Sequence, residues 1–224
     1  GARLQDRTQY EIYGPSVRNL RRLDKPVLLA ECGLVNERWG PYPATNALER
    51  PATGPKDRRG YAFHEALWAG FMAGGAGTGQ PWWWDSMIDP WDLYPQYRPF
   101  ARFVEGLALN QAPMPPSDAD VAPGHLQVFA RSGPVGAIAW VMNRNDWWRP
   151  LVMEGKDPEK VSGAQVTLSG LEAGVYHLEI LDTWTGDLLD KRRMIVPEGR
   201  EMTIVPLPDF TIDLALRLLR EPPG

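Results

Sequence analysis

The chain has 224 residues, a length that fits one large domain or two small ones. Its formal net charge of -4 excludes the basic footprint of a nucleic-acid-binding protein. One cysteine, Cys32, three scattered histidines and no acidic cluster with ligand spacing argue against a disulfide framework or a metal centre. No apolar run approaches the roughly 20 residues of a membrane span. We therefore expect no metal, no cofactor and no membrane or nucleic-acid partner.

Residues 1 to about 110 alternate helix and strand patterns. A first helix is predicted from Gly14-Pro15-Ser16, with Asp24-Lys25-Pro26 ending it. The continuous apolar run 27–30 predicts a strand buried on both faces, as in a parallel sheet. Helical spacing then predicts a second helix over 61–73, ended by Gly74-Gly75. Residues 79–84 are a second strand candidate, and Pro99 opens a third helix.

The second part of the chain changes to a period of two. Residues 113–118 contain three prolines, a composition that disfavours both helix and strand, so we predict a linker there. About seven short alternating strands follow, and they predict a β-sandwich domain over 119–220. The residues on the expected inward faces are Leu126, Val128 and Ala130; Ile138, Trp140 and Met142; Val166 and Leu168; Tyr176, Leu178 and Ile180; Met202 and Ile204; and Ile212, Leu214, Leu216 and Leu218.

Two strands that are buried on both faces cannot stand alone, because their edges and apolar faces need partners. A strand-helix barrel takes about 250 residues, and this half supplies less than half of one. The predicted fold is therefore α/β plus all-β. Residues 1–112 form the C-terminal part of a (β/α)8 TIM barrel, with its last two strands and helices, and a β-sandwich follows. We expect the beginning of the barrel to precede residue 1.

Glu31 is the first candidate for chemistry. It follows the predicted strand 27–30, at the end of a barrel strand where active sites form. Burying a carboxylate costs free energy, so a glutamate at the end of a buried strand indicates a functional role. The alternative is that Glu31 caps a loop or pairs with Arg38. By alternation Cys32 points to the opposite side, where we expect an inert core thiol.

The ten tryptophans favour a carbohydrate ligand weakly, although for most of them we prefer a role in the core. Trp82 and Trp84 share one face of the second strand candidate, and Trp83 takes the other. An indole at the barrel mouth would form a floor on which a sugar ring stacks. Trp147 and Trp148 lie in a long loop between sandwich strands. They either bind sugar or attach the sandwich to the barrel, and we prefer the second interpretation.

These motifs together resemble the C-terminal part of a clan A retaining glycoside hydrolase, near family 5 and its cellulase-like relatives. The resemblance lies in the ordered segments PVLLAECG (26–33), FHEALWAG (63–70), GTGQPWWWDS (77–86) and YRPFARF (97–103). It implies that Glu31 is the catalytic nucleophile and that Trp84, Trp82, Trp39 and Asp85 bind substrate. Such enzymes often carry a C-terminal β-sandwich. The acid/base glutamate of the clan, at the end of strand four, has no counterpart here and would precede residue 1.

The sequence thus predicts a fragment of a secreted β-glycosidase that hydrolyses a plant or algal polysaccharide with retention. Its expected partners are the polysaccharide and either the missing barrel segment or a second copy of the chain. One alternative is a non-catalytic carbohydrate-binding or interaction protein that uses Trp147 and Trp148 as its platform. Another is a split enzyme whose first half comes from a different chain.

Overall fold

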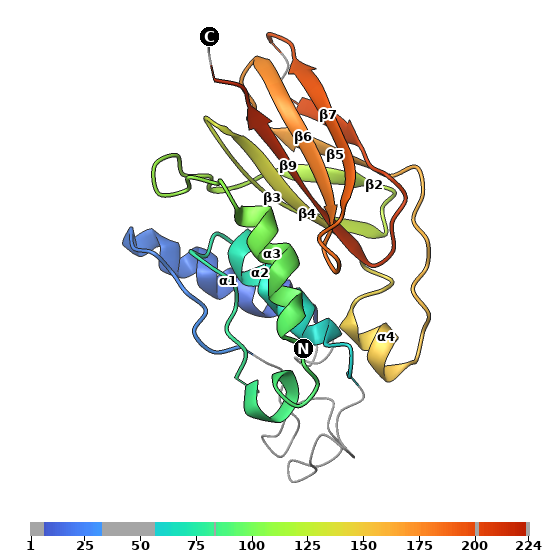
Figure 1. Ribbon diagram of the computed structural model, residues 1–224. Coiled ribbons are helices and arrows are strands. Elements are labelled where there is room, and N and C mark those ends of the chain that lie inside the picture. The colour runs from blue at the N-terminus through green and yellow to red at the C-terminus, as the bar shows by residue number, and fades with distance from the viewer. Residues whose placement is uncertain (1–6, 33–56, 83, 200–201, 223–224) are drawn as a thin grey trace. The chain divides into compact units, whose positions relative to one another are not determined.

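The computed structural model describes residues 7–32, 57–82, 84–199 and 202–222. The fold is mixed α/β, its two sheets are antiparallel, and the described residues contain no closed barrel. The chain divides into two compact units (Figure 1). We call residues 1–97 with 146–157 the helical unit, and residues 98–145 with 158–224 the sheet unit. No described helix has the length and apolarity that crossing a bilayer requires.

The regular elements that the structure describes in the helical unit are short helices. α1 (Gln9–Leu20) and α2 (Tyr61–Met72) contact each other, and α4 (Trp148–Met153) contacts α2. Three single-turn helices complete the set, namely η2 (Arg21–Leu23), the π-helix η3 (Trp84–Ile88) and η4 (Tyr94–Gln96). α3 (Tyr97–Val104) begins where this unit ends and continues into the sheet unit.

α1 starts five residues before the predicted Gly14, at Gln9, so the predicted start was wrong. Thr8 and Glu11 form a capping box, in which the Thr8 hydroxyl accepts from the Glu11 N–H and the Glu11 carboxylate accepts from the Thr8 N–H. These two bonds satisfy donors that a helix start otherwise leaves unpaired, and the helix tolerates Pro15 in its interior. The Thr-x-x-Glu signal was present in the sequence.

α2 confirms the predicted second helix. Every residue of α2 except Tyr61 is buried, as expected for a helix that is apolar nearly all round. Asp57 lies just before it and accepts hydrogen bonds from the N–H groups of Tyr61 and Ala62 at 2.7 and 2.9 Å. The helix ends where predicted, because Gly74 adopts a positive φ of 103° that a residue with a Cβ rarely adopts.

The predicted strand over 27–30 is not buried on both faces. Leu28 is 62% exposed and no regular strand forms there. The segment instead runs parallel to residues 76–82, through hydrogen bonds from the N–H of Ala76 to the Val27 carbonyl and from Gln80 to Leu29, and through one parallel bridge between Cys32 and Pro81. The second strand candidate, 79–84, is likewise reduced to this bridge, because the chain turns into η3 at Trp84. Only the parallel neighbourhood of the two segments matches the expectation.

The sheet unit contains two antiparallel sheets. The first has six strands in the order β1-β3-β4-β9-β6-β7, and the second has three in the order β2-β5-β8. Their bounds are β1 Pro116–Ser117, β2 Ala119–Ala122, β3 Leu126–Gly133, β4 Gly136–Asn143, β5 Gln165–Ser169, β6 Gly174–Asp182, β7 Leu188–Val196, β8 Met202–Pro206 and β9 Asp213–Arg220. One apolar core draws side chains from both sheets, so the arrangement is sandwich-like.

The core confirms four of the predicted inward faces, on β3, β5, β6 and β9, and corrects two others. Ile212, predicted as part of the last face, precedes β9 and is not in this core. On β8 the inward residues are Thr203 and Val205, while Met202 and Ile204 are 45% and 47% exposed. On β4 the core takes Ala137, Ala139 and Val141, and the opposite face is buried as well, so all eight residues of the strand are buried. The proline-rich stretch predicted as a linker includes the short strand β1, which pairs with β3.

The second face of the six-stranded sheet carries a buried carboxylate. Asp213, at the start of β9, accepts hydrogen bonds from the indole N–H of Trp140 at 2.7 Å and of Trp184 at 3.0 Å. The Thr183 hydroxyl donates a third bond at 2.6 Å. Asp213 is only 2% exposed, and these three donors supply the hydrogen bonds that its buried carboxylate requires.

Candidate functional site

Glu31 lies at the carboxyl end of the first of the two parallel segments. The next residue, Cys32, donates its N–H to the Gln80 carbonyl and accepts from the Trp82 N–H, both at 2.8 Å. This register places Glu31 beside Pro81 and Trp82, at the carboxyl end of the second segment. α2 connects the two segments, so the local arrangement is a strand-helix-strand connection with very short strands.

An open pocket of about 380 Å³ lies at this end of the two segments. Ala30 and Glu31 line it from the first segment, and Pro81, Trp82, Trp84 and Asp85 line it from the second. The structure therefore brings together four of the five residues predicted to act on a substrate. The fifth, Trp39, lies outside the described residues, as do Arg38, the alternative partner of Glu31, and Trp83.

The side chains around this pocket are open to solvent. Trp82 is 52% exposed and Trp84 60% exposed, which is unusual for the largest apolar side chain. Glu31 is also exposed, and its carboxylate makes no hydrogen bond or ion pair within the described part of the chain. Glu31 and the two exposed indoles thus line one pocket, and together they offer an acceptor or nucleophile and flat apolar area, a combination suited to a sugar ring.

Cys32 faces away from the pocket, as alternation predicts. It is 4% exposed, its thiol donates to the Gln80 carbonyl at 3.1 Å, and burial raises its pKa to about 12. A thiol with that pKa is protonated at neutral pH and is a poor nucleophile. Gly79 lies against the same sulfur, and a Cβ at Gly79 would come within 2.9 Å of it and 2.8 Å of the Ala66 carbonyl. This close approach seats the second segment on α2.

Glu65 is a buried carboxylate in the helix that connects the two segments, and the sequence analysis did not single it out. Its side chain is buried in α2, and one carboxylate oxygen accepts from the Gln9 N–H at 3.2 Å. The other oxygen accepts from the Trp148 N–H at 2.6 Å. Gln9 and Trp148 are the first residues of α1 and α4, so one carboxylate satisfies donors at two helix N-termini. Glu65 therefore joins three helices of the helical unit.

The tryptophan pair in the long sandwich loop does not form an exposed platform. Trp148 is 0% exposed, and it packs with Ala62 of α2 in a small core that Trp147 and Tyr61 border. Its indole N–H donates to the Arg7 carbonyl at 3.3 Å. The loop thus contributes α4 to the helical unit, and the buried Trp148 does not fit the alternative of an exposed sugar-binding pair.

No group of three or more metal-ligating side chains occurs among the described residues. No protein-family model matches the chain, and a search of curated proteins found no similar sequence. The pocket around Glu31 is therefore the feature of the molecule that bears most directly on function.

Proposed function

We propose that the chain is the C-terminal portion of a retaining β-glycosidase and that Glu31 is its nucleophile. One observation carries the proposal, namely a carboxylate that has no hydrogen-bond or ion-pair partner among the described residues. It lies at the carboxyl end of two parallel segments, in the same pocket as two half-exposed indoles. Catalytic residues of strand-helix barrels lie at this end of the strands. Trp82 and Trp84 supply stacking area, and Asp85 supplies an acceptor for sugar hydroxyl groups.

The apolar surface of residues 27–30 supports the barrel part of the proposal. Leu28 is 62% exposed, although the sequence around it has the apolar character of a strand covered on both faces. The two parallel segments pair with each other through one bridge, and among the described residues neither of them belongs to a larger sheet, so their outer edges have no strand partner there. A further barrel segment, from the same protein before residue 1 or from a second chain, would cover this surface and extend the pairing. Such a protein would act on a polysaccharide outside the cell.

The chemistry follows from the carboxylate. An oxygen of Glu31 attacks the anomeric carbon, a glycosyl ester forms, and the bond to the leaving oxygen breaks while that oxygen takes a proton from a second carboxylic acid. Water then attacks the anomeric carbon of this ester, gives its proton to the second carboxyl group, which is now a carboxylate, and breaks the bond to Glu31, so that the sugar and the free Glu31 carboxylate are released. We place this acid in the preceding barrel segment, because retention needs two carboxyl groups about 5 Å apart.

A mechanism-based label tests the assignment. The chain is combined with the preceding barrel segment and treated with a 2-deoxy-2-fluoro β-glycoside, and the labelled peptide is identified by mass spectrometry. We expect the sugar on Glu31 and a loss of turnover of about 10⁴-fold or more in Glu31→Gln, with an unchanged circular dichroism spectrum. Glu198→Gln, at an exposed position of the sheet unit that lines neither pocket, is the matched control and keeps full activity. A label on any other residue would contradict the proposal.

A second candidate function is sugar binding without hydrolysis, which the exposure of Trp82 and Trp84 favours. In that case Trp84→Ala abolishes binding to an oligosaccharide, Glu31→Gln leaves it unchanged, and no covalent label forms even in the presence of the preceding segment. Covalent labelling of Glu31 would exclude this alternative.

A further inference from the structure

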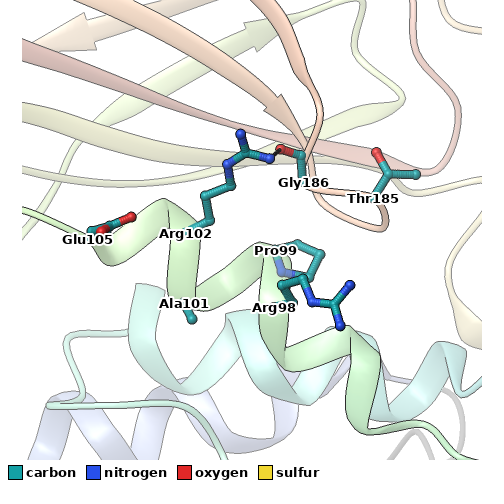
Figure 2. Close-up of a pocket in the computed structure, with 7 residues that line it drawn as sticks. All are labelled: Arg98, Pro99, Ala101, Arg102, Glu105, Thr185 and Gly186. Carbon is teal, nitrogen blue, oxygen red and sulfur yellow. Dashed lines mark hydrogen bonds between the residues drawn. The ribbon is translucent and has the colours of Figure 1, made fainter.

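A second open pocket, of about 610 Å³, lies entirely within the sheet unit, where the start of α3 meets the turn between β6 and β7 (Figure 2). α3 contributes Arg98, Pro99, Ala101 and Arg102, Glu105 follows the helix, and the turn contributes Thr185 and Gly186. The pocket is separate from the candidate site, and the sequence analysis assigned it no role.

The turn is held firmly against the helix. Arg102 donates to the Gly186 carbonyl at 2.9 Å, as Figure 2 shows. Gly186 has a φ of 76°, and a Cβ there would lie 3.3 Å from the Cα of Pro99, so the turn depends on glycine at this position. Asp182 fixes the rest of the turn by accepting from the N–H groups of Trp184 and Thr185, both at 2.8 Å. The pocket wall is therefore built in advance of any ligand.

Arg98 is the unused charge in this pocket. It is exposed, and its guanidinium makes no hydrogen bond or ion pair within the described residues. Arg102 lies one helical turn further on and uses a donor for Gly186. Figure 2 shows the two guanidinium groups pointing in different directions, that of Arg102 toward Gly186 and that of Arg98 away from it. The Thr185 hydroxyl accepts from the Asp187 N–H at 3.1 Å, which leaves its own proton to donate.

The polar groups are divided along the pocket. Arg98 and Thr185 lie at one end, and Glu105 lies beyond Arg102 at the other (Figure 2). A guanidinium binds an oxyanion through paired N–H donors, whereas a carboxylate accepts from hydroxyl groups and repels an anion. A ligand that matches both ends carries one anionic group and several hydroxyl groups.

We propose that this pocket binds a sugar acid, with its carboxylate or sulfate group on Arg98 and the Thr185 hydroxyl and with its ring hydroxyls toward Glu105. Pro99 and Ala101 provide the apolar wall along which the ring lies. Glu31 has no part in the proposal, so the pocket binds its ligand whether or not the chain belongs to a glycosidase.

Titration calorimetry of the full chain with glucuronate tests this proposal, with glucose 6-sulfate, glucose and inorganic phosphate as comparison ligands. We expect glucuronate or glucose 6-sulfate to bind, and the better of the two identifies the natural anionic group. Glucose and phosphate should each bind at least about tenfold more weakly, because each satisfies only one end of the pocket. Amide shifts of Thr185 and Gly186 in NMR spectra locate the bound ligand.

Variants of the arginine separate the site from general charge attraction. Arg98→Gln should weaken binding at least about tenfold, and Arg98→Lys should weaken it less, since lysine keeps the charge without the paired donors. Arg22→Gln, an exposed arginine of η2 in the helical unit, is the matched control and should bind normally. Unchanged binding by Arg98→Gln, equal binding of glucose, or phosphate binding as tight as that of glucuronate would each overturn the proposal.

Discussion

In the sheet unit each described strand has an antiparallel partner, whereas in the helical unit two short parallel segments meet through one bridge. The sheet unit closes a core between its own sheets. The helical unit leaves Leu28, Trp82 and Trp84 more than half exposed, and one buried carboxylate, that of Glu65, joins three of its helices. The described antiparallel strands find their partners within the sheet unit, but a parallel segment depends on neighbours that the chain supplies from elsewhere.

The largest expected effect comes from Trp148 of the helical unit. Because Trp148 is fully buried, Trp148→Ala leaves a cavity, and it should lower the free energy of unfolding of the helical unit by about 3 to 5 kcal/mol. Trp84→Ala, at a position 60% exposed, should cost far less. Hydrogen exchange measures each unit separately, since α2 amides report the helical unit and β4 amides the sheet unit. Equal loss of protection in both units would show that they do not unfold independently.

Variants of Glu65 test how much the carboxylate that joins three helices contributes to the stability of the helical unit. Glu65→Ala leaves the N–H groups of Gln9 and Trp148 without their acceptor, and it should destabilise the helical unit by about 3 kcal/mol. Glu65→Gln keeps one acceptor oxygen and should cost roughly half as much. Exchange protection of amides in α1 and α4 is the measurement. Protection that stays unchanged in Glu65→Ala would mean that the helices hold together by apolar contacts alone.

The two units should respond to pH with opposite signs. Burial raises the pKa of Asp57 from 3.8 to about 6, and the N–H groups of α2 and the charge of His64 only partly offset this rise. The folded helical unit therefore binds a proton that the unfolded chain has lost, and its free energy of unfolding should fall by up to about 3 kcal/mol as pH rises from about 4 to 6. In Asp57→Asn this dependence should vanish.

Glu179 gives the opposite dependence in the sheet unit. Partial burial alone would raise its pKa, but hydrogen bonds and charges from Lys191 and Arg217 outweigh burial and lower the pKa below its usual value of 4.5. Its contribution to stability is present above that pH and is lost as pH falls through the lowered value. Exchange in α2 and β6, corrected for intrinsic rates between about pH 3 and pH 7, measures both trends. If protection in α2 and in β6 changed with pH in the same direction, the comparison would be contradicted.

The smallest expected effect tests which face of β8 is inward. Val205→Thr places a hydroxyl in the sandwich core and should cost about 1 to 3 kcal/mol. Ile204→Thr, at its half-exposed neighbour, should change the free energy of unfolding by no more than about 0.5 kcal/mol. The free energies of unfolding of the two variants are compared by urea unfolding and by hydrogen exchange of the β4 amides. A larger loss in Ile204→Thr would restore the face predicted from sequence.

Local patterns in the sequence were enough to predict the elements that are determined by their own residues. α2 has an apolar run with a glycine stop, and β5, β6 and β9 alternate clearly. The position of Glu31 after a short apolar segment predicted its place beside Trp82 and Trp84, because a helical connection returns the chain in parallel. The start of α1 was also present in the sequence, in the spacing of Thr8 and Glu11, although Pro15 drew the prediction too far along the chain.

Only the tertiary structure decided features whose partners lie far apart in the chain. Glu65 meets residues 56 and 83 positions away, so no local pattern distinguishes it from a solvated helix residue. β4 is apolar at nearly every position and β8 carries apolar residues on both faces, so alternation cannot say which face a neighbouring sheet covers. The same holds for Trp148, which reads as exposed in a polar loop and is buried because α4 packs on α2. Burial depends on what the rest of the chain places against a residue, and that information is absent from its sequence neighbours.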